Sequence, residues 1–179
     1  MGVRQMSPAT TRRNQARGDP VLASLWNLLD QVKDPEIPVL SLLDLGILQD
    51  VELQGEAIIV TITTTYSGCP AMDVIGDEIR QVLRQAGYTN VVVKQRLAPA
   101  WTTDWITEEG RRKLLEYGIA PPAEVSSDKR ELLEGKLLIP CPLCGGTRTE
   151  RVSEFGSTAC KAQYRCQDCG EPFDYFKCI

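Results

Sequence analysis

Two Cys-x-x-Cys pairs near the C-terminus constrain this chain more than any other feature of its sequence. The pairs are Cys141 with Cys144 and Cys166 with Cys169; a glycine follows each pair, and twenty-one residues separate them. Each pair places two thiolates on a tight turn, and two such turns can hold one ion tetrahedrally. A segment of this size has little hydrophobic core, so the metal must supply much of its folding free energy. We therefore expect residues 136–179 to form a four-cysteine zinc ribbon.

The identity of the metal and the fate of the other cysteines are separate questions. All-sulfur ligation also suits an iron–sulfur cluster, but the spacing of two paired turns favours structural zinc. The total of seven cysteines is odd, which argues for metal ligation in a reducing cytoplasm and against a disulfide framework. Cys160 and Cys178 are then either buried small hydrophobic residues or alternative ligands of a cluster.

The chain has no histidine, and this absence excludes several kinds of active site. Neither a Ser-His-Asp nor a Cys-His nucleophile system can be built from this chain alone. A di-iron carboxylate site of the Glu-x-x-His kind is excluded in the same way. Any general acid or base must be a carboxylate, lysine, tyrosine or cysteine.

Composition and charge narrow the classes of partner. Hydrophobic residues make up 42% of the chain, enough for a real core, and no apolar run is long enough for a membrane span. Residues 1–19 carry four arginines and one aspartate, so this stretch has a charge of +3 and the remainder −7. An acidic body argues against nucleic acid as the main partner.

Hydrophobic periodicity predicts an α+β fold in two modules. Residues 1–19 are polar and aperiodic and are expected to be disordered. A small α/β domain over residues 20–118 should contain a three-stranded sheet with flanking helices, followed by a linker at 119–135 and the ribbon at 136–179. Within the domain we expect helices at 20–33, 70–86 and 108–117, strands at 47–54, 57–65 and 90–97, and an ordered loop at 34–46.

Cys69 is the candidate functional cysteine outside the ribbon. We expect it at the N-cap or in the first turn of a helix, with Pro70 at the first helical position, where unpaired amides and the helix dipole stabilise a thiolate. The alternative is a capping residue packed under its loop. Asp34, Glu36 and Asp44 are either solvated carboxylates and N-caps or a polar patch around Cys69 that meets a metal or a partner protein.

Three motifs in the first module resemble a known family. These are DPEIP (34–38), LDLG (43–46) and TTTYSGCP (63–70), which are similar to the domain shared by cytosolic iron–sulfur assembly proteins of the MIP18 type. The resemblance implies a small α/β fold in which Cys69 corresponds to the signature loop cysteine. It also implies a role in the maturation of iron–sulfur proteins rather than turnover of a substrate.

The remainder of the chain resembles a second, more specific family. Residues 98–122 and 154–178 look like the D subunits of bacterial phenylacetyl-CoA epoxidase systems. That resemblance implies a place in aerobic phenylacetate degradation, with a di-iron oxygenase and an iron–sulfur reductase as partner proteins. Members of that family are needed for activity but are not the oxygenase, which agrees with the missing histidine.

Two functional hypotheses follow. The first is an accessory protein that assists iron or iron–sulfur cluster maturation of the epoxidase system, with Cys69 as a transient ligand. The second is a non-catalytic adaptor subunit of the epoxidase complex. Nucleic-acid binding by the ribbon is suggested by fold analogy alone and is opposed by the charge. Direct catalysis would need a redox cofactor site that the sequence does not display, and a homo-oligomer is compatible with both hypotheses.

Overall fold

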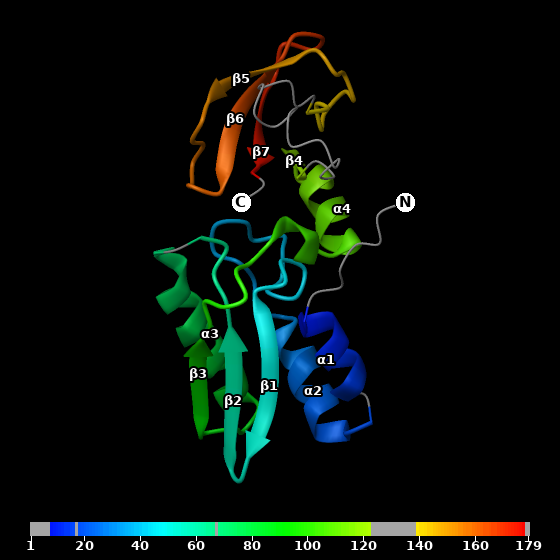
Figure 1. The fold of residues 1–179 in the computed structure, drawn as a ribbon. Coiled ribbons are helices and arrows are strands. Elements are labelled where there is room, and N and C mark those ends of the chain that lie inside the picture. Colours follow the sequence, from blue (N-terminus) through cyan, green and yellow to red (C-terminus); the bar gives the residue numbers. More distant parts are fainter. Residues whose placement is uncertain (1–7, 17, 67, 123–138, 178–179) are drawn as a thin grey trace. The chain divides into compact units, whose positions relative to one another are not determined.

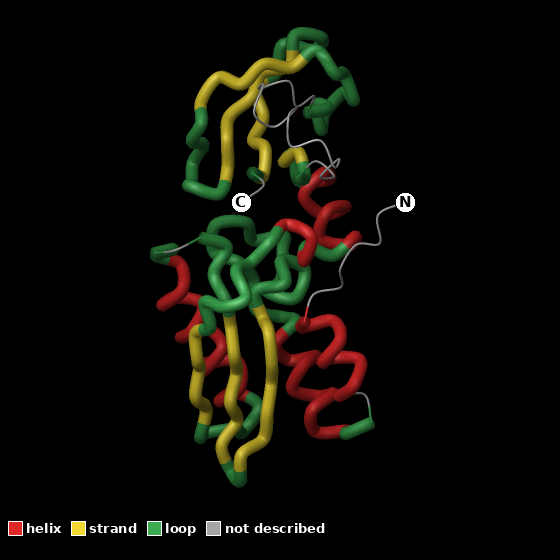
Figure 2. The backbone as a smooth tube through the Cα atoms, in the orientation of Figure 1, coloured by secondary structure: helices red, strands yellow, loops and turns green. Residues whose placement is uncertain are grey.

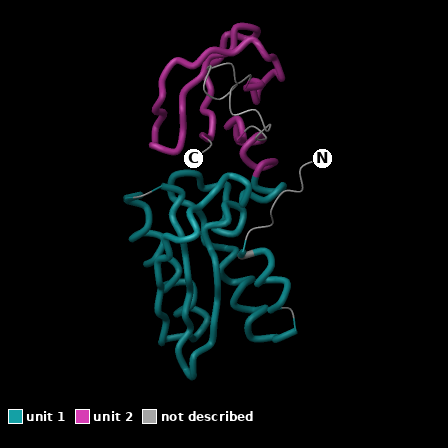
Figure 3. Tube along the Cα trace, viewed as in Figure 1, with its two compact units in different colours: residues 1–110, 179 teal, residues 111–178 magenta. Residues whose placement is uncertain are grey.

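The computed structural model describes residues 8–16, 18–66, 68–122 and 139–177. Its chain divides into two compact units, residues 1–110 with residue 179 and residues 111–178 (Figure 3). The division falls inside a helix, whereas the sequence placed the end of the first domain at residue 118. The expected domain boundaries stay a prediction.

The first unit is built on a three-stranded sheet, as the sequence predicted (Figure 1). Strand β1 (Leu48–Gln54) pairs antiparallel with β2 (Ala57–Ile62), and β2 pairs parallel with β3 (Val91–Gln95). The hairpin between β1 and β2 turns at Gly55, whose φ of +63° suits glycine. Because β2 and β3 are parallel, the chain must cross over between them, and a helix makes that connection.

Two helices cover the core of this unit. Helix α2 (Pro20–Leu29) begins at the N-cap Asp19, whose Oδ1 accepts hydrogen bonds from the amides of Val21 and Leu22. Helix α3 (Ala71–Gln85) is the crossover between β2 and β3 and ends before Gly87, which has a φ of +94°. The fully buried side chains are predominantly aliphatic and include Leu25, Leu29, Leu40, Leu42, Leu48, Ile58, Ile75 and Ile79.

Helix α1 (Pro8–Ala16) corrects the expectation that residues 1–19 are disordered, within the part of that segment that the structure describes. The helix has no apolar stripe, so periodicity gave no signal for it. Ionic contacts hold it instead: Arg12 pairs with Asp50, and Arg13 reaches Asp30 at 3.3 Å. Residues 1–7 lie outside the described residues.

The second unit contains a four-stranded sheet in the order β4-β7-β6-β5. Its strands are β4 (Ile119–Ala120), β5 (Thr149–Ser153), β6 (Lys161–Cys166) and β7 (Pro172–Phe176). Helix α4 (Glu108–Glu116) precedes β4 and spans the division between the units. Among the described residues of this unit, eight buried side chains form one hydrophobic cluster that includes two of the ribbon cysteines: Ala120, Ile139, Cys141, Ala162, Tyr164, Cys166, Phe173 and Tyr175.

Strand β4 lies where the sequence predicted a linker. Ile119 and Ala120 pair in parallel with Asp174 and Tyr175 of β7, and both are buried. The first residues of the expected linker are therefore part of the sheet, while residues 123–135 lie outside the described residues. None of the described helices is long and apolar enough to cross a membrane.

Candidate functional site

Three loops of the first unit lie at the same end of its sheet, where β2 and β3 finish and β1 begins (Figure 2). They are the loop that precedes β1, the loop that follows β2 and the loop that follows β3. Backbone bonds join them: the Thr63 amide donates to the Ile47 carbonyl at 2.9 Å, and the Thr107 amide donates to the Asp44 carbonyl at 2.9 Å. The carboxyl ends of parallel strands are where α/β sheets commonly place their ligands. The loop that contains Cys69 is one of these three.

Cys69 lies one residue before the N-cap of helix α3, rather than at the N-cap or within the first turn. The helix begins at Ala71 with Pro70 as its N-cap, so the expected position differs by one residue. The Cys69 carbonyl still accepts a hydrogen bond of 3.4 Å from the Met72 amide, which keeps the cysteine at the edge of the helix. The side chain is half-buried, and Gly68 before it has a φ of +81°. The thiol is thus held at the start of a helix, after a left-handed residue whose conformation glycine adopts without strain.

Asp34 is a capping residue of its own loop. Its Oδ1 accepts hydrogen bonds from the amides of Glu36 at 2.9 Å and Ile37 at 2.8 Å. Only 8% of the residue is exposed, so this carboxylate organises buried backbone. That geometry supports the N-cap alternative for Asp34. The grouping of Asp34 and Glu36 around Cys69 stays a prediction.

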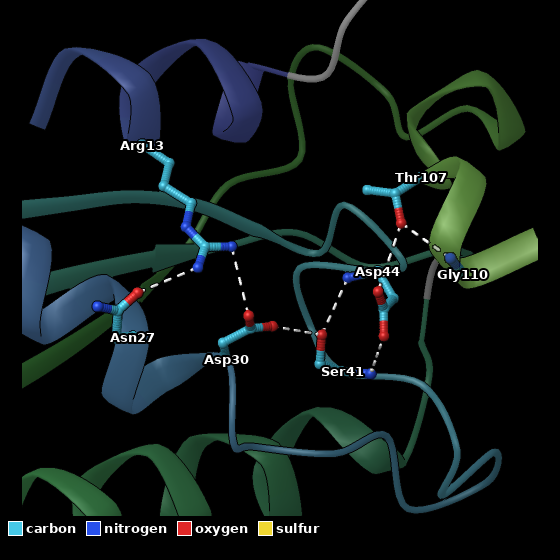
Figure 4. A network of polar contacts seen from close by, with 7 residues as sticks. All are labelled: Arg13, Asn27, Asp30, Ser41, Asp44, Thr107 and Gly110. Carbon is cyan, nitrogen blue, oxygen red and sulfur yellow. Dashed lines mark hydrogen bonds and ion pairs between the residues drawn. The ribbon is translucent and has the colours of Figure 1, made fainter. Parts of the chain in front are cut away.

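Hydrogen bonds of Asp44 connect the loop that precedes β1 with the loop that follows β3 and leads into helix α4 (Figure 4). Its Oδ2 accepts from the Ser41 amide at 2.9 Å, while the Ser41 Oγ accepts from the Asp44 amide at 3.1 Å. Thr107 Oγ1 lies 3.4 Å from Asp44 Oδ1 and accepts the Gly110 amide at 2.9 Å. Sequence reasoning missed Ser41 and Thr107 in this network. The Ser-x-x-Asp spacing was a usable signal, because it resembles a capping box.

The four predicted ribbon cysteines come together in the second unit. Their sulfur atoms all lie within 4.8 Å of one another, with Cys141 and Cys169 at 3.8 Å and Cys144 and Cys166 at 3.6 Å. In a regular tetrahedron with a Zn–S distance of about 2.3 Å, neighbouring sulfurs are about 3.8 Å apart. The four thiols therefore fit one tetrahedral ion.

The two cysteine turns have matching backbones. In the first, the Gly145 amide donates to the Cys141 carbonyl at 2.9 Å, and in the second the Gly170 amide donates to the Cys166 carbonyl at 3.0 Å. Gly145 and Gly170 have φ values of +73° and +83°. Both glycines are in the left-handed region, and this conformation lets nearby amides face sulfur. One of them is the Gly146 amide, 3.4 Å from the Cys144 sulfur.

The thiols differ in acidity when no ion is bound. The pKa of Cys166 is lowered to about 7, chiefly because the Cys169 amide donates a hydrogen bond to its sulfur. For Cys144 the Gly146 amide acts in the same direction. The pKa of Cys144 is nevertheless raised to about 12. The causes that raise it are the thiol of Cys169, loss of solvation, and the thiols of Cys166 and Cys141, which together outweigh the effect of the Gly146 amide. A bound cation would have to displace protons from this cluster.

Cys160 is not part of the cluster. Among the described residues the metal-compatible group consists of the four ribbon cysteines alone. Cys160 is buried, and its sulfur lies 3.0 Å from Thr158 Oγ1. This supports the interpretation of Cys160 as a small buried residue. Cys178 lies outside the described residues.

Comparisons with known proteins agree with both modules. Residues 22–94 match the iron–sulfur cluster assembly protein family, and residues 125–177 match the PaaD zinc beta ribbon domain. The chain is 49% identical over 160 residues to the putative D subunit of the 1,2-phenylacetyl-CoA epoxidase of Escherichia coli, covering 89% of this chain and 94% of the relative.

Shorter relatives match the first module only. An Fe-S protein maturation auxiliary factor of Porphyromonas gingivalis is 34% identical over 93 residues, covering 51% of this chain and 85% of that protein. A factor of the same kind from Bacillus subtilis is 32% identical over 85 residues, covering 45% of this chain and 80% of that protein. The ribbon therefore distinguishes this chain from these shorter relatives.

Proposed function

This chain belongs to the family of the putative D subunit of the Escherichia coli 1,2-phenylacetyl-CoA epoxidase, and from that premise we propose that it is an accessory protein of phenylacetyl-CoA epoxidation. Its task is to assist iron or iron–sulfur cluster maturation in the epoxidase system. The observation that carries this proposal is the first module, which matches an iron–sulfur cluster assembly family over residues 22–94. The absence of histidine supports a role other than that of the oxygenase.

Cys69 is the residue that we propose for contact with the metal cargo. It is half-buried, precedes a helix, and lies on a loop at the carboxyl end of β2. A thiolate on such a loop can bind iron transiently, because the loop backbone can change its hydrogen bonds while the sheet stays folded. The clients in this proposal are the iron–sulfur reductase and the di-iron oxygenase of the epoxidase system.

The test is a Cys69→Ser variant in cells that make the whole epoxidase system. We expect the reductase isolated from these cells to contain less iron and sulfide, with unchanged amounts of reductase polypeptide. Cys160→Ser is the matched control, because it also removes one thiol but lies in the other unit. A reductase fully loaded with its cluster in the Cys69→Ser cells would refute the role of Cys69.

For the ribbon we propose structural zinc. The support is the sulfur geometry, because the separations of 3.6 and 3.8 Å suit one ion, whereas a multinuclear cluster binds its thiolates through separate iron atoms that hold them further apart. Zinc would act here as a fixed crosslink between the two cysteine turns. Metal analysis with an absorption spectrum of anaerobically purified protein tests this. We expect colourless protein with one zinc per chain, and brown protein with iron and sulfide would contradict it.

An adaptor role is the second candidate, and the ribbon favours it. A tetrahedral site with four protein ligands has no open position for a substrate, so this module serves binding or stability. The test is co-purification with the other epoxidase subunits from cells. A stoichiometric complex that survives the Cys69→Ser change would support the adaptor, while consistent absence from the oxygenase complex would exclude it.

A further inference from the structure

Helix α3 carries a stripe of four charged residues along one side. Asp73, Asp77, Arg80 and Arg84 follow one another at intervals of four, three and four residues, so they lie on the same face of the helix. We call this set the α3 charge stripe. Its amino-terminal half is acidic and its carboxyl-terminal half is basic, and the helix buries a different face.

The charge stripe lies beside the open edge of the sheet. Its first three residues line a cavity of about 330 Å³ together with Val93 and Gln95 of β3. Among the described strands, β3 pairs with β2 and has no second neighbour. Val92, the second residue of β3, is 40% exposed. An open edge of β-branched residues is a surface that readily pairs with another strand.

The order of charges makes this surface complementary to itself. If two copies meet through a two-fold axis, their α3 helices run in opposite directions side by side. An axis between residues 78 and 79 then brings Asp73 opposite the partner's Arg84 and Asp77 opposite the partner's Arg80. Each contact is repeated by symmetry, so four pairs of opposite charge form and no like charges face each other. Such self-complementarity is the requirement for an isologous dimer.

The geometry of the sheet accommodates the same axis. Antiparallel pairing of β3 with its copy would give a continuous six-stranded sheet with both α3 helices on one face. Helix α3 contacts β3, so this axis brings the charge stripes of the two copies close together on that face of the sheet. Within one protomer Arg80 already bonds Asp77 at 2.8 Å. In the dimer these two residues and their copies would form a ring of alternating charge.

We infer that the α3 charge stripe and the β3 edge form the interface of a homodimer. The occupant of this surface is a second copy of the chain. This inference concerns self-association and stands independently of the proposed maturation role.

The experiment measures oligomeric state by sedimentation equilibrium for the full chain and for charge variants. Asp73→Arg with Asp77→Arg makes the stripe wholly basic, and Arg80→Asp with Arg84→Asp makes it wholly acidic. Each variant alone should lose dimerisation, with a dissociation constant raised at least about 100-fold by like-charge repulsion. An equimolar mixture of the two variants should dimerise again, because the basic stripe then faces the acidic one.

A matched control carries the same change of charge elsewhere. Glu52→Arg with Glu56→Arg alters two exposed residues of the β1–β2 hairpin and should dimerise like the wild type. A wild type that is monomeric at all concentrations would overturn the inference, as would variants that dimerise normally. Loss of binding to another epoxidase subunit in the charge variants, with a monomeric wild type, would assign the surface to that subunit and also overturn it.

Discussion

At the scale of single residues, Gly46 shows how a short motif fixes a loop. It is the last residue of the LDLG motif, has a φ of +68°, and closely approaches Trp105. A Cβ at this position would lie 2.7 Å from the Trp105 Cβ and 2.8 Å from the Trp105 carbonyl oxygen. Both the backbone conformation and the contact therefore require glycine.

Gly46→Ala should be strongly destabilising, and Gly55 offers a matched control. Gly55 has nearly the same φ, +63°, but open space around it. Gly55→Ala should cost about 1–2 kcal/mol for the left-handed conformation alone. Gly46→Ala should cost that amount plus about 1–3 kcal/mol for the clash. Urea unfolding of both variants measures the difference, and equal losses of stability would show that the contact with Trp105 is unimportant.

The unequal acidity of the ribbon thiols predicts how metal affinity depends on pH. The pKa of Cys144 is raised to about 12, so its proton must be displaced by the metal throughout the neutral range. The pKa of Cys166 is lowered to about 7, so below pH 7 it too is increasingly protonated. Protons compete with the metal in both cases. Affinity should fall as pH falls, more steeply below pH 7.

Competition with a zinc chelator between pH 6 and pH 8 measures this dependence, with proton release followed in weakly buffered solution. The number of protons released per bound ion should rise as the pH falls through 7. A chelator-corrected affinity that is constant across this range would contradict the prediction.

At the scale of elements, helix α1 depends on charge more than on hydrophobic burial. Arg13 contacts Asp30 at 3.3 Å and Asn27 at 3.1 Å, and Arg12 pairs with Asp50. Partly exposed pairs of this kind contribute about 0.2–1 kcal/mol each and are weakened by salt. The docking of α1 should therefore be salt-sensitive.

Hydrogen exchange of the α1 amides tests this dependence. We expect protection of residues 8–16 to decrease between low and high salt, and the double variant Arg12→Gln with Arg13→Gln to show the low protection at both. The amides of α3, whose packing rests on buried apolar side chains, provide the internal control. Salt-independent protection of α1 would show that its ion pairs do not determine its docking.

Sequence patterns predicted the elements that bury a regular face and missed those that do not. Helix α3 was found because Ile75, Ile79 and Leu83 recur at helical spacing, and β2 and β3 were found because they are runs of mostly β-branched residues beside turn residues. Helix α1 has no such face. Strand β4 has two residues and acquires its partner, β7, from far along the chain, which no local pattern reveals.

The same distinction applies to the candidate sites. The four ribbon cysteines were predictable because each pair is local and both pairs share one spacing. The backbone bonds that join the loops at this end of the first sheet were not, since they depend on the order and direction of three strands. Contacts such as Trp101 Nε1 to the Leu45 carbonyl, at 2.8 Å, join residues distant in sequence. Such contacts follow from tertiary packing alone.

At the scale of the whole molecule, the two units differ in what holds them together. The first has an extensive aliphatic core beneath a sheet and two helices. In the part of the second unit that the structure describes, one hydrophobic cluster has eight buried residues, and two of these, Cys141 and Cys166, belong to the four-cysteine group that could hold a metal ion. A unit whose described core is that small is expected to need a crosslink to offset its conformational entropy. The two units should therefore respond differently to loss of the metal.

Chelation of the metal should unfold the second unit and leave the first folded. Hydrogen exchange should show lost protection in β5, β6 and β7, with the protection of β2 and α3 unchanged. Cys141→Ser should have the same effect without a chelator, and Cys160→Ser, which leaves the four ligands intact, should not. If β6 and β7 keep their protection after verified removal of the metal, the fold of this unit does not depend on its metal. If β2 loses protection as well, the stability of the first unit is coupled to the ribbon rather than independent of it.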